Sequence, residues 1–139
     1  MAKVNMANKI VIANGKRKQA VARANIRAGK GKVRINGTPL SEYLPLMFRQ
    51  KIEEPILIAG DLLNSIDIDV NIKGGGQSGQ TEAARLAIAR GLVEYSGSDE
   101  LKQAYLGYDR HLLVADVRRN EPHKPNKSSP RSKRQKSYR

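Results

Sequence analysis

The segment of the chain that most resembles a site for chemistry is glycine-rich, Gly-Gly-Gly-Gln-Ser-Gly-Gln-Thr at residues 74–81. It lies between an expected strand and an expected helix, and it comes close to both the P-loop and the G-x-G-x-x-G patterns. Gln80, however, stands where the P-loop requires a lysine for the β- and γ-phosphates, and an amide cannot supply that charge. The dinucleotide pattern also requires a second strand ending in an acidic residue about 20 positions further on, and no such strand is expected. We therefore do not expect ATP or NAD to bind here.

Two compatible interpretations of these glycines remain. Glycine allows a strand and a helix to meet without Cβ clashes. Bare backbone N–H groups at a helix N-terminus can also accept a phosphate of RNA. The candidate RNA-binding residues of this segment are Gly74, Gly75, Gly76 and Gln77.

The other residues that could catalyse a reaction or bind a metal are few and scattered. The chain has no cysteine, and His111 and His123 do not have the spacing of metal ligands. The acidic pair at 67 and 69 is explained more simply as the solvated face of a strand, and the pair at 53–54 as the end of a helix. Two isolated histidines do not support a Ser–His–Asp arrangement. The sequence therefore predicts no enzyme, metal site, cofactor or small-molecule substrate.

The charge of the chain is strongly positive and unevenly distributed. It has 26 Lys and Arg against 13 Asp and Glu, a net charge of +13. Residues 1–41 carry 10 basic and no acidic side chains, whereas residues 42–116 carry 7 basic and 12 acidic ones. Such asymmetry indicates a polyanionic partner. Composition alone fits a structural RNA-binding protein and also a free-standing nucleic-acid chaperone or DNA-compacting protein.

The last 23 residues, 117–139, form a basic tail with 9 Lys and Arg and the single acid Glu121. This segment contains three prolines and few apolar residues, so it cannot bury enough surface to offset about 1–2 kcal/mol per residue of ordering entropy. We expect residues 1–116 to form a globular RNA-binding domain. We expect 117–139 to be disordered alone and extended when bound.

Apolar periodicity predicts the elements that position these residues. Alternation predicts strands at 9–14, 20–28, 32–36 and 65–73, with a basic turn at 15–18. Helices are expected at 46–54, 56–63, 80–95 and 99–106, the first two being separated by Pro55. The alanine-rich strand at 20–28 would let the helix at 80–95 approach closely. The expected fold is α+β, a four-stranded mixed sheet with helices packed on one face and Arg23, Arg27, Lys32 and Arg34 on the other.

The chain offers no sign of a membrane segment. Its best apolar run, residues 55–60, is far shorter than the roughly 20 residues that a membrane span needs. The apolar stretch at 10–13 is too short for the core of a signal peptide. We expect a cytoplasmic protein.

Several motifs resemble those of the small-subunit ribosomal protein nine family, in order along nearly the whole chain. These motifs are Gly15-Lys16-Arg17-Lys18, Ala22-Arg23-Ala24, Ile35-Asn36-Gly37, Gly74-Gly75-Gly76-x-x-Gly79-Gln80, Glu82-Ala83-Ala84-Arg85, Asp116-x-Arg118-Arg119-x-Glu121 and Lys136-Ser137-Tyr138-Arg139. The ending Gln135–Arg139 is similar to the archaeal and eukaryotic branch, and residues 121–125 are similar to archaeal members.

The resemblance implies a structural protein of the small ribosomal subunit that supports translation. It implies a left-handed βαβ crossover, binding to the 3′ domain of the small-subunit rRNA in the subunit head, and neighbouring head proteins as partners. It also implies a tail that reaches the peptidyl-site tRNA, with Tyr138 and Arg139 as the tRNA contacts. The remaining candidate rRNA-binding residues are basic or polar: Lys16, Arg17, Lys18, Arg23, Arg27, Lys32, Arg34, Arg118, Arg119, His123, Lys124, Lys127, Arg131, Lys133, Arg134 and Lys136.

Overall fold

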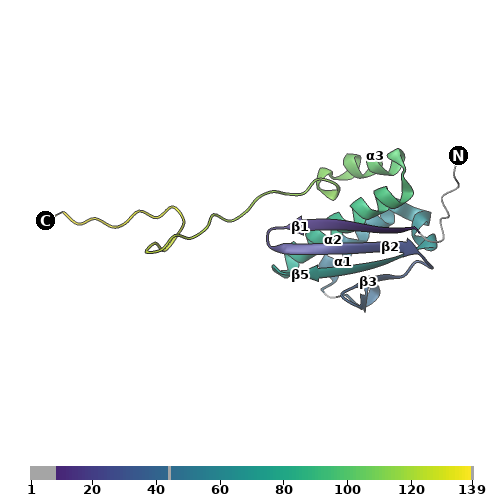
Figure 1. Cartoon of the computed structure of the whole chain (residues 1–139), viewed down its shortest axis with the longest axis horizontal. Helices are drawn as coiled ribbons and strands as arrows, with labels where there is room; N and C mark the ends of the chain where they lie inside the picture. Colours follow the sequence, from purple (N-terminus) through teal and green to yellow (C-terminus); the bar gives the residue numbers. More distant parts are fainter. Residues whose placement is uncertain (1–8, 44, 139) are drawn as a thin grey trace.

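The computed structural model describes residues 9–43 and 45–138, which form one α+β domain followed by a long segment without helix or strand (Figure 1). The strands are β1 (Ile10–Arg17), β2 (Ala20–Ala28), β3 (Val33–Ile35), β4 (Thr38–Pro39) and β5 (Ile66–Lys73). The helices are α1 (Leu46–Ala59), α2 (Gln77–Ser96) and α3 (Asp99–Tyr108), with short 3-10 turns at Leu40–Glu42, Gly60–Ser65 and Arg110–Leu112. The helices in this part of the chain are too short or too polar to cross a membrane.

The sheet is mixed and has five strands in the order β1-β2-β5-β3-β4. The expected number, four, was wrong because β4 is a two-residue strand that pairs with β3 across the tight turn at Asn36 and Gly37. Both turn residues have positive φ, 50° and 83°, as a two-residue hairpin loop requires. β1, β2 and β5 pair antiparallel, whereas β3 and β5 pair parallel and are connected through α1.

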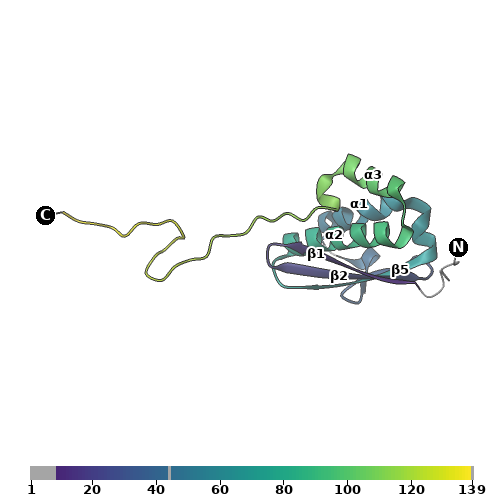
Figure 2. The ribbon, with the colours of Figure 1, turned by 45° about the horizontal axis from the view of Figure 1, so that its top comes forward.

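One face of the sheet is covered by helices, with α2 directly on the strands and α1 and α3 outside it (Figure 2). The alanines of β2 that point to this face, Ala20, Ala22 and Ala24, are fully buried, as the alternation predicts. β1 and α2 lie so close that a Cβ added to Gly15 would be 2.1 Å from the carbonyl oxygen of Ala83. Small side chains on both elements therefore bring α2 almost into backbone contact with the sheet.

Helix α1 corrects the expectation of two short helices on either side of Pro55. The helix runs through the proline, whose ring is buried. A proline inside a helix removes one hydrogen bond from the backbone. Tertiary contacts compensate, since α1 packs on α2 and α3 and the buried hydroxyl of Tyr105 donates a hydrogen bond of 2.7 Å to the Pro55 carbonyl.

The turn between β1 and β2 also differs from the expectation. Gly15, Lys16 and Arg17 continue β1, and the turn consists of Lys18 and Gln19, with Lys18 at a φ of 52°. Strand alternation therefore sends Lys16 to the open face of the sheet and Arg17 to the helix-covered side.

Candidate nucleic-acid interface

Three segments that are distant in the sequence meet at one end of the domain. The β1–β2 turn, the glycine loop before α2 and the start of the basic tail line a common hollow. Lys18, Gly75, Gly76, Gln77 and Arg119 lie in it, and we call these residues the loop end. All five are exposed. The loop end therefore combines two cations with bare backbone at the start of a helix.

The glycines of the loop have different roles. Gly74 and Gly75 adopt positive φ, and a Cβ on either would lie within 3 Å of backbone atoms of the β1–β2 turn. Gly76 is the N-cap of α2, has ordinary extended backbone, and faces open space. Both interpretations of the glycines thus have a physical counterpart, close packing at Gly74 and Gly75 and an accessible helix N-terminus at Gly76. The side chain of Gln80, the P-loop lysine position, donates to the Gly74 carbonyl at 3.1 Å and closes the loop.

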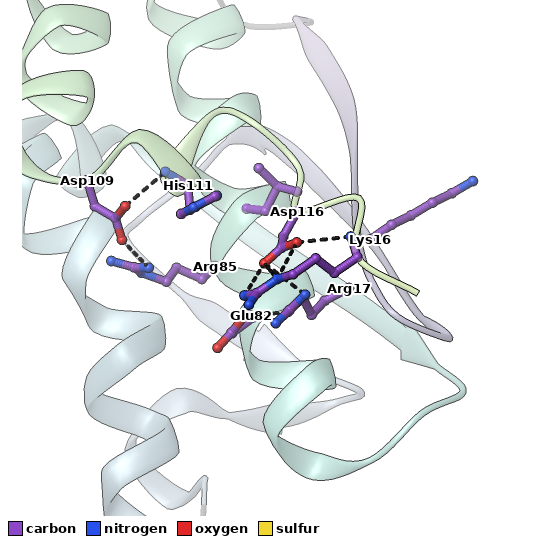
Figure 3. Close-up of a pocket in the computed structure, with 9 residues that line it drawn as sticks. Lys16, Arg17, Glu82, Arg85, Asp109, His111 and Asp116 are labelled. Carbon is purple, nitrogen blue, oxygen red and sulfur yellow. Dashed lines mark hydrogen bonds and ion pairs between the residues drawn. The ribbon is translucent and has the colours of Figure 1, made fainter. Parts of the chain in front are cut away.

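Arg17 is held by acidic side chains inside the domain (Figure 3). Its Nε lies 2.9 Å from Glu82 of α2, and its terminal nitrogen lies 2.9 Å from Asp116. Asp116 also accepts hydrogen bonds from Arg118, the shortest being 2.6 Å. The hydrogen bonds from the Arg118 guanidinium and amide, followed by the charges of Arg118 and Arg17, hold the pKa of Asp116 well below its usual range. We call Arg17, Glu82, Asp116 and Arg118 the Asp116 clamp.

Two arginines of α2, Arg85 and Arg90, bind residues 109–113, which precede the clamp in the sequence. Arg85 pairs with Glu54 of α1 and, at 2.9 Å, with Asp109, while Arg90 donates to the Leu113 carbonyl at 3.0 Å. Burial raises the pKa of Asp109, but hydrogen bonds from the His111 amide and from Arg85 outweigh that effect and lower it overall. Sequence reasoning missed this role of Arg85 and Arg90. Residues five apart on a helix lie about 140° apart around its axis, so their spacing does not predict that both reach the segment 109–113. Only the folded chain shows these contacts.

The open face of the sheet is divided electrostatically into two halves. In one half, Asp69 accepts ion pairs from both Arg27, at 3.2 Å, and Arg34, at 2.8 Å. In the other half, next to the loop end, Arg23 and Lys73 have no acidic partner among the described residues. Asp69 was expected to belong to the solvated face of a strand, but it forms ion pairs with two arginines.

Asp67 caps the loop between β2 and β3. Its carboxylate accepts the backbone N–H groups of Lys32, at 3.0 Å, and Lys30, at 2.9 Å. These hydrogen bonds lower the pKa of Asp67.

Beyond Asn120 the tail leads away from the domain, and its described candidate residues are exposed (Figures 1 and 2). Arg131 forms an ion pair of 2.6 Å with Glu121 across a loop of the tail. His123, Lys124, Lys127, Lys133, Arg134, Lys136 and Tyr138 are spread along the segment, and Arg139 lies outside the described residues. Within residues 9–43 and 45–138, no group of three or more His, Asp or Glu side chains could hold a metal ion.

Comparison with known proteins gives a consistent result. The family model described as ribosomal protein S9/S16 matches residues 15–139. A small ribosomal subunit protein uS9 of Methanococcus vannielii is 52% identical over 133 residues, which cover 94% of this chain and 99% of the relative. One from Methanococcus maripaludis strain C7 is 51% identical with the same coverage. These matches confirm the resemblance found in the motifs, including its archaeal character. The family consists of ribosomal proteins rather than enzymes. The chain thus belongs to the ribosomal protein S9/S16 family.

Proposed function

We propose that the chain is a structural constituent of the small ribosomal subunit in the cytoplasm, where it binds the 3′ domain of the rRNA in the subunit head. The observation that carries this proposal is the loop end, where Lys18 and Arg119 flank bare backbone at the N-terminus of α2. Family membership supports it, because the relatives are named small ribosomal subunit proteins.

Binding occurs mainly through phosphate neutralisation, and each contact releases condensed counterions. Tyr95 and Tyr105 are buried, so few aromatic side chains of the domain are available to stack on bases. Recognition of the shape and backbone of folded RNA therefore fits better than sequence readout of a single strand.

The candidate cations differ in how readily they can donate to a phosphate. Lys16, Lys18, Arg23, Lys32 and Arg119 are exposed and have no acidic partner among the described residues. Arg27, Arg34 and Arg118 are already paired, but each guanidinium has five N–H donors and can serve two acceptors. Arg17, whose side chain is 14% exposed, contributes chiefly by holding Asp116.

The tail is proposed to be disordered in the unbound protein and to become extended on binding rRNA, with neighbouring head proteins also in contact. Its composition supports this, since the segment has almost no apolar side chains to bury. By family resemblance, Tyr138 and Arg139 contact the peptidyl-site tRNA.

The hand of the β3–α1–β5 crossover is proposed to be left-handed, as the family resemblance implies. The path of the chain supports this, with β5 beside β3 and the helices behind the sheet in Figure 1. Most crossovers between parallel strands are right-handed, so no general rule predicts this hand.

The loop end is tested with the double variant Lys18→Gln/Arg119→Gln. Its affinity for a transcript of the rRNA 3′ domain should fall, and the slope of log K against log salt should shrink by about 0.7–0.9 for each phosphate that is no longer neutralised. The matched control is Lys30→Gln/Lys102→Gln, in the β2–β3 loop and on α3, which removes two exposed charges outside the loop end. Equal effects of the double variant and the control on affinity would mean that only net charge matters and would contradict the proposed interface.

The tRNA contact is tested by deleting Arg139. Many rRNA contacts lie upstream, so the deletion should leave incorporation into the subunit intact. It should speed dissociation of tRNA from the peptidyl site, because a charged hydrogen bond contributes about 1.5–3 kcal/mol. Normal incorporation with an unchanged rate of tRNA dissociation would reject this role.

A further inference from the structure

A second hollow lies on the open face of the sheet, on the side opposite the helices. It is lined by Val21, Arg23, Asn36, Asn71 and Lys73 and has a volume of about 560 Å³. This is within the range of about 300–1,000 Å³ typical of small-ligand sites. Strand register builds it, since Val21 on β2 pairs with Lys73 on β5, and Arg23 pairs with Asn71.

One polar side chain of this hollow is held by a hydrogen bond, and the others keep free donors and acceptors. The side chain of Asn36 accepts the Ile72 amide at 2.8 Å, which orients the side-chain oxygen toward β5 and leaves its NH₂ group as a donor. Asn71, Arg23 and Lys73 form no side-chain hydrogen bond or ion pair with the described residues. The nearest acids of the same face, Asp69 and Asp67, are engaged with other groups, so the hollow carries uncompensated positive charge.

The chemistry of the lining is that of a nucleotide site. Val21, a half-buried lining residue, offers an apolar contact for the face of a base. Asparagine amides present a donor and an acceptor together, which matches the edge of a nucleobase. Arg23 and Lys73 at the rim suit the adjoining phosphates. A phosphate alone would not use the valine and the amides, and an acidic peptide would not use the paired donor and acceptor.

We propose that this hollow binds one unpaired nucleotide of the rRNA, with its base against Val21 and its pairing edge toward Asn71. The nucleotide is turned out of its helix, and its phosphates lie on Arg23 and Lys73. This proposal rests on the proposed rRNA-binding function and adds to it one site at which a base, rather than the backbone alone, is recognised.

The test compares Asn71→Ala with the matched control Asn25→Ala in the full chain. Asn25 lies on the same face of the neighbouring strand but outside the hollow, opposite Asp69. Binding to the 3′-domain transcript should weaken about tenfold in Asn71→Ala, with an unchanged salt slope, because no charge is removed. Lys73→Gln should instead reduce the salt slope by about 0.7. Asn25→Ala should bind like the parent protein.

A second measurement probes the RNA directly. Dimethyl sulfate and a carbodiimide together modify the pairing edges of the four bases. The parent protein should protect one unpaired base that becomes reactive when Asn71→Ala is bound. Unchanged affinity and no newly reactive base in Asn71→Ala would overturn the nucleotide site while leaving rRNA binding intact.

Two further outcomes are distinguishable from these. Unchanged RNA affinity of Asn71→Ala together with reduced incorporation into the subunit would show that a protein occupies the hollow, and would overturn the proposal. Failure of the parent protein to bind the transcript would instead reject the proposed function itself. Matched thermal unfolding of the Asn71 and Asn25 variants ensures that the comparison reports on binding.

Discussion

At the residue scale, neighbouring basic side chains in this chain have opposite roles. Lys16 is exposed on the open face, whereas Arg17 lies under the turn between Glu82 and Asp116. Composition assigns both to RNA, but strand alternation separates them. Arg17 is mostly buried, and its ion pair with Asp116 fixes where the tail leaves the domain.

The Asp116 clamp should make the free energy of unfolding depend on pH in the acidic range. The pKa of Asp116 is lowered in the folded chain, so the clamp contributes fully above the ordinary value of 3.8 and is lost as pH falls below it. The free energy of unfolding, measured by denaturant between pH 5 and 2, should fall less steeply in Asp116→Asn than in the parent. Glu121→Gln, which removes an exposed acid of the tail, is the control and should behave like the parent. Identical slopes for parent and Asp116→Asn would contradict the clamp.

Gly15 should tolerate no side chain. Its added Cβ would meet the backbone of α2 at 2.1 Å, so Gly15→Ala must push the helix from the sheet. We expect a loss of about 3 kcal/mol or more in chemical denaturation, at the upper end of overpacking costs. Gly76→Ala faces open space and should unfold almost like the parent. A stable Gly15→Ala protein would show that α2 can shift without cost.

The sequence predicts the surroundings of a residue only where they depend on residues nearby in the sequence. Alternation placed the buried alanines and isoleucines of β2 and β5 correctly, because the period of two is a property of the strand itself. It could not show that Arg17 reaches Asp116, since 99 positions separate them and no local pattern couples them. The glycine loop was located by motif, whereas the split between packing glycines and the exposed Gly76 depends on where the β1–β2 turn lies.

At the element scale, boundaries were wrong where tertiary contacts overrule local preference. Pro55 was expected to separate two helices, and the helix expected at 99–106 ends before Gly107, yet both residues lie inside helices. Intrinsic preferences cost about 1 kcal/mol for glycine and about 3 kcal/mol for proline. Packing of α1 and α3 against α2 exceeds these costs, and a sequence shows the penalties but not the packing.

The hydrogen bond between α3 and α1 gives a prediction at this scale. Tyr105→Phe removes the hydroxyl that donates to the Pro55 carbonyl and should destabilise the domain by about 1 kcal/mol. Burial raises the pKa of Tyr105, so the parent should also lose stability as pH rises above 10, the ordinary tyrosine value. That alkaline loss should be smaller in Tyr105→Phe when unfolding is followed by denaturant at several pH values. Tyr108→Phe, on the exposed face of α3, is the control, and an equal effect there would contradict the assignment.

At the scale of the whole molecule, the hydrophobic core and the basic tail occupy different parts of the chain. The described core residues all lie before residue 113, whereas the basic tail follows Asp116. Fully extended, residues 117–138 would span about 75 Å. In the proposed function, the domain therefore anchors the protein at one place, and the contacts proposed for the tail lie far from it.

Truncation tests this division. A chain that ends at Asn120 keeps the Asp116 clamp but lacks 7 Lys and Arg of the tail. Its thermal midpoint should stay within about 2 °C of the parent, since the core is unchanged. Its affinity for the rRNA transcript should fall and depend less on salt, with a slope smaller by about 0.7–0.9 for each phosphate that the tail neutralises in the full chain. A truncated chain that no longer unfolds cooperatively would show that the tail is part of the folded unit.

The Asp116 clamp also imposes an order of events on synthesis. Arg17 is made among the first residues, yet its partner Asp116 emerges only after every strand and helix of the domain. Because Arg17 lies on β1 and Glu82 on α2, the complete clamp forms only when β1 and α2 are packed together. The tail thus acquires its fixed starting direction only on a finished domain. A chain whose domain has not folded still carries the positive charges of the tail, but no ion pair fixes the direction in which the tail leaves it.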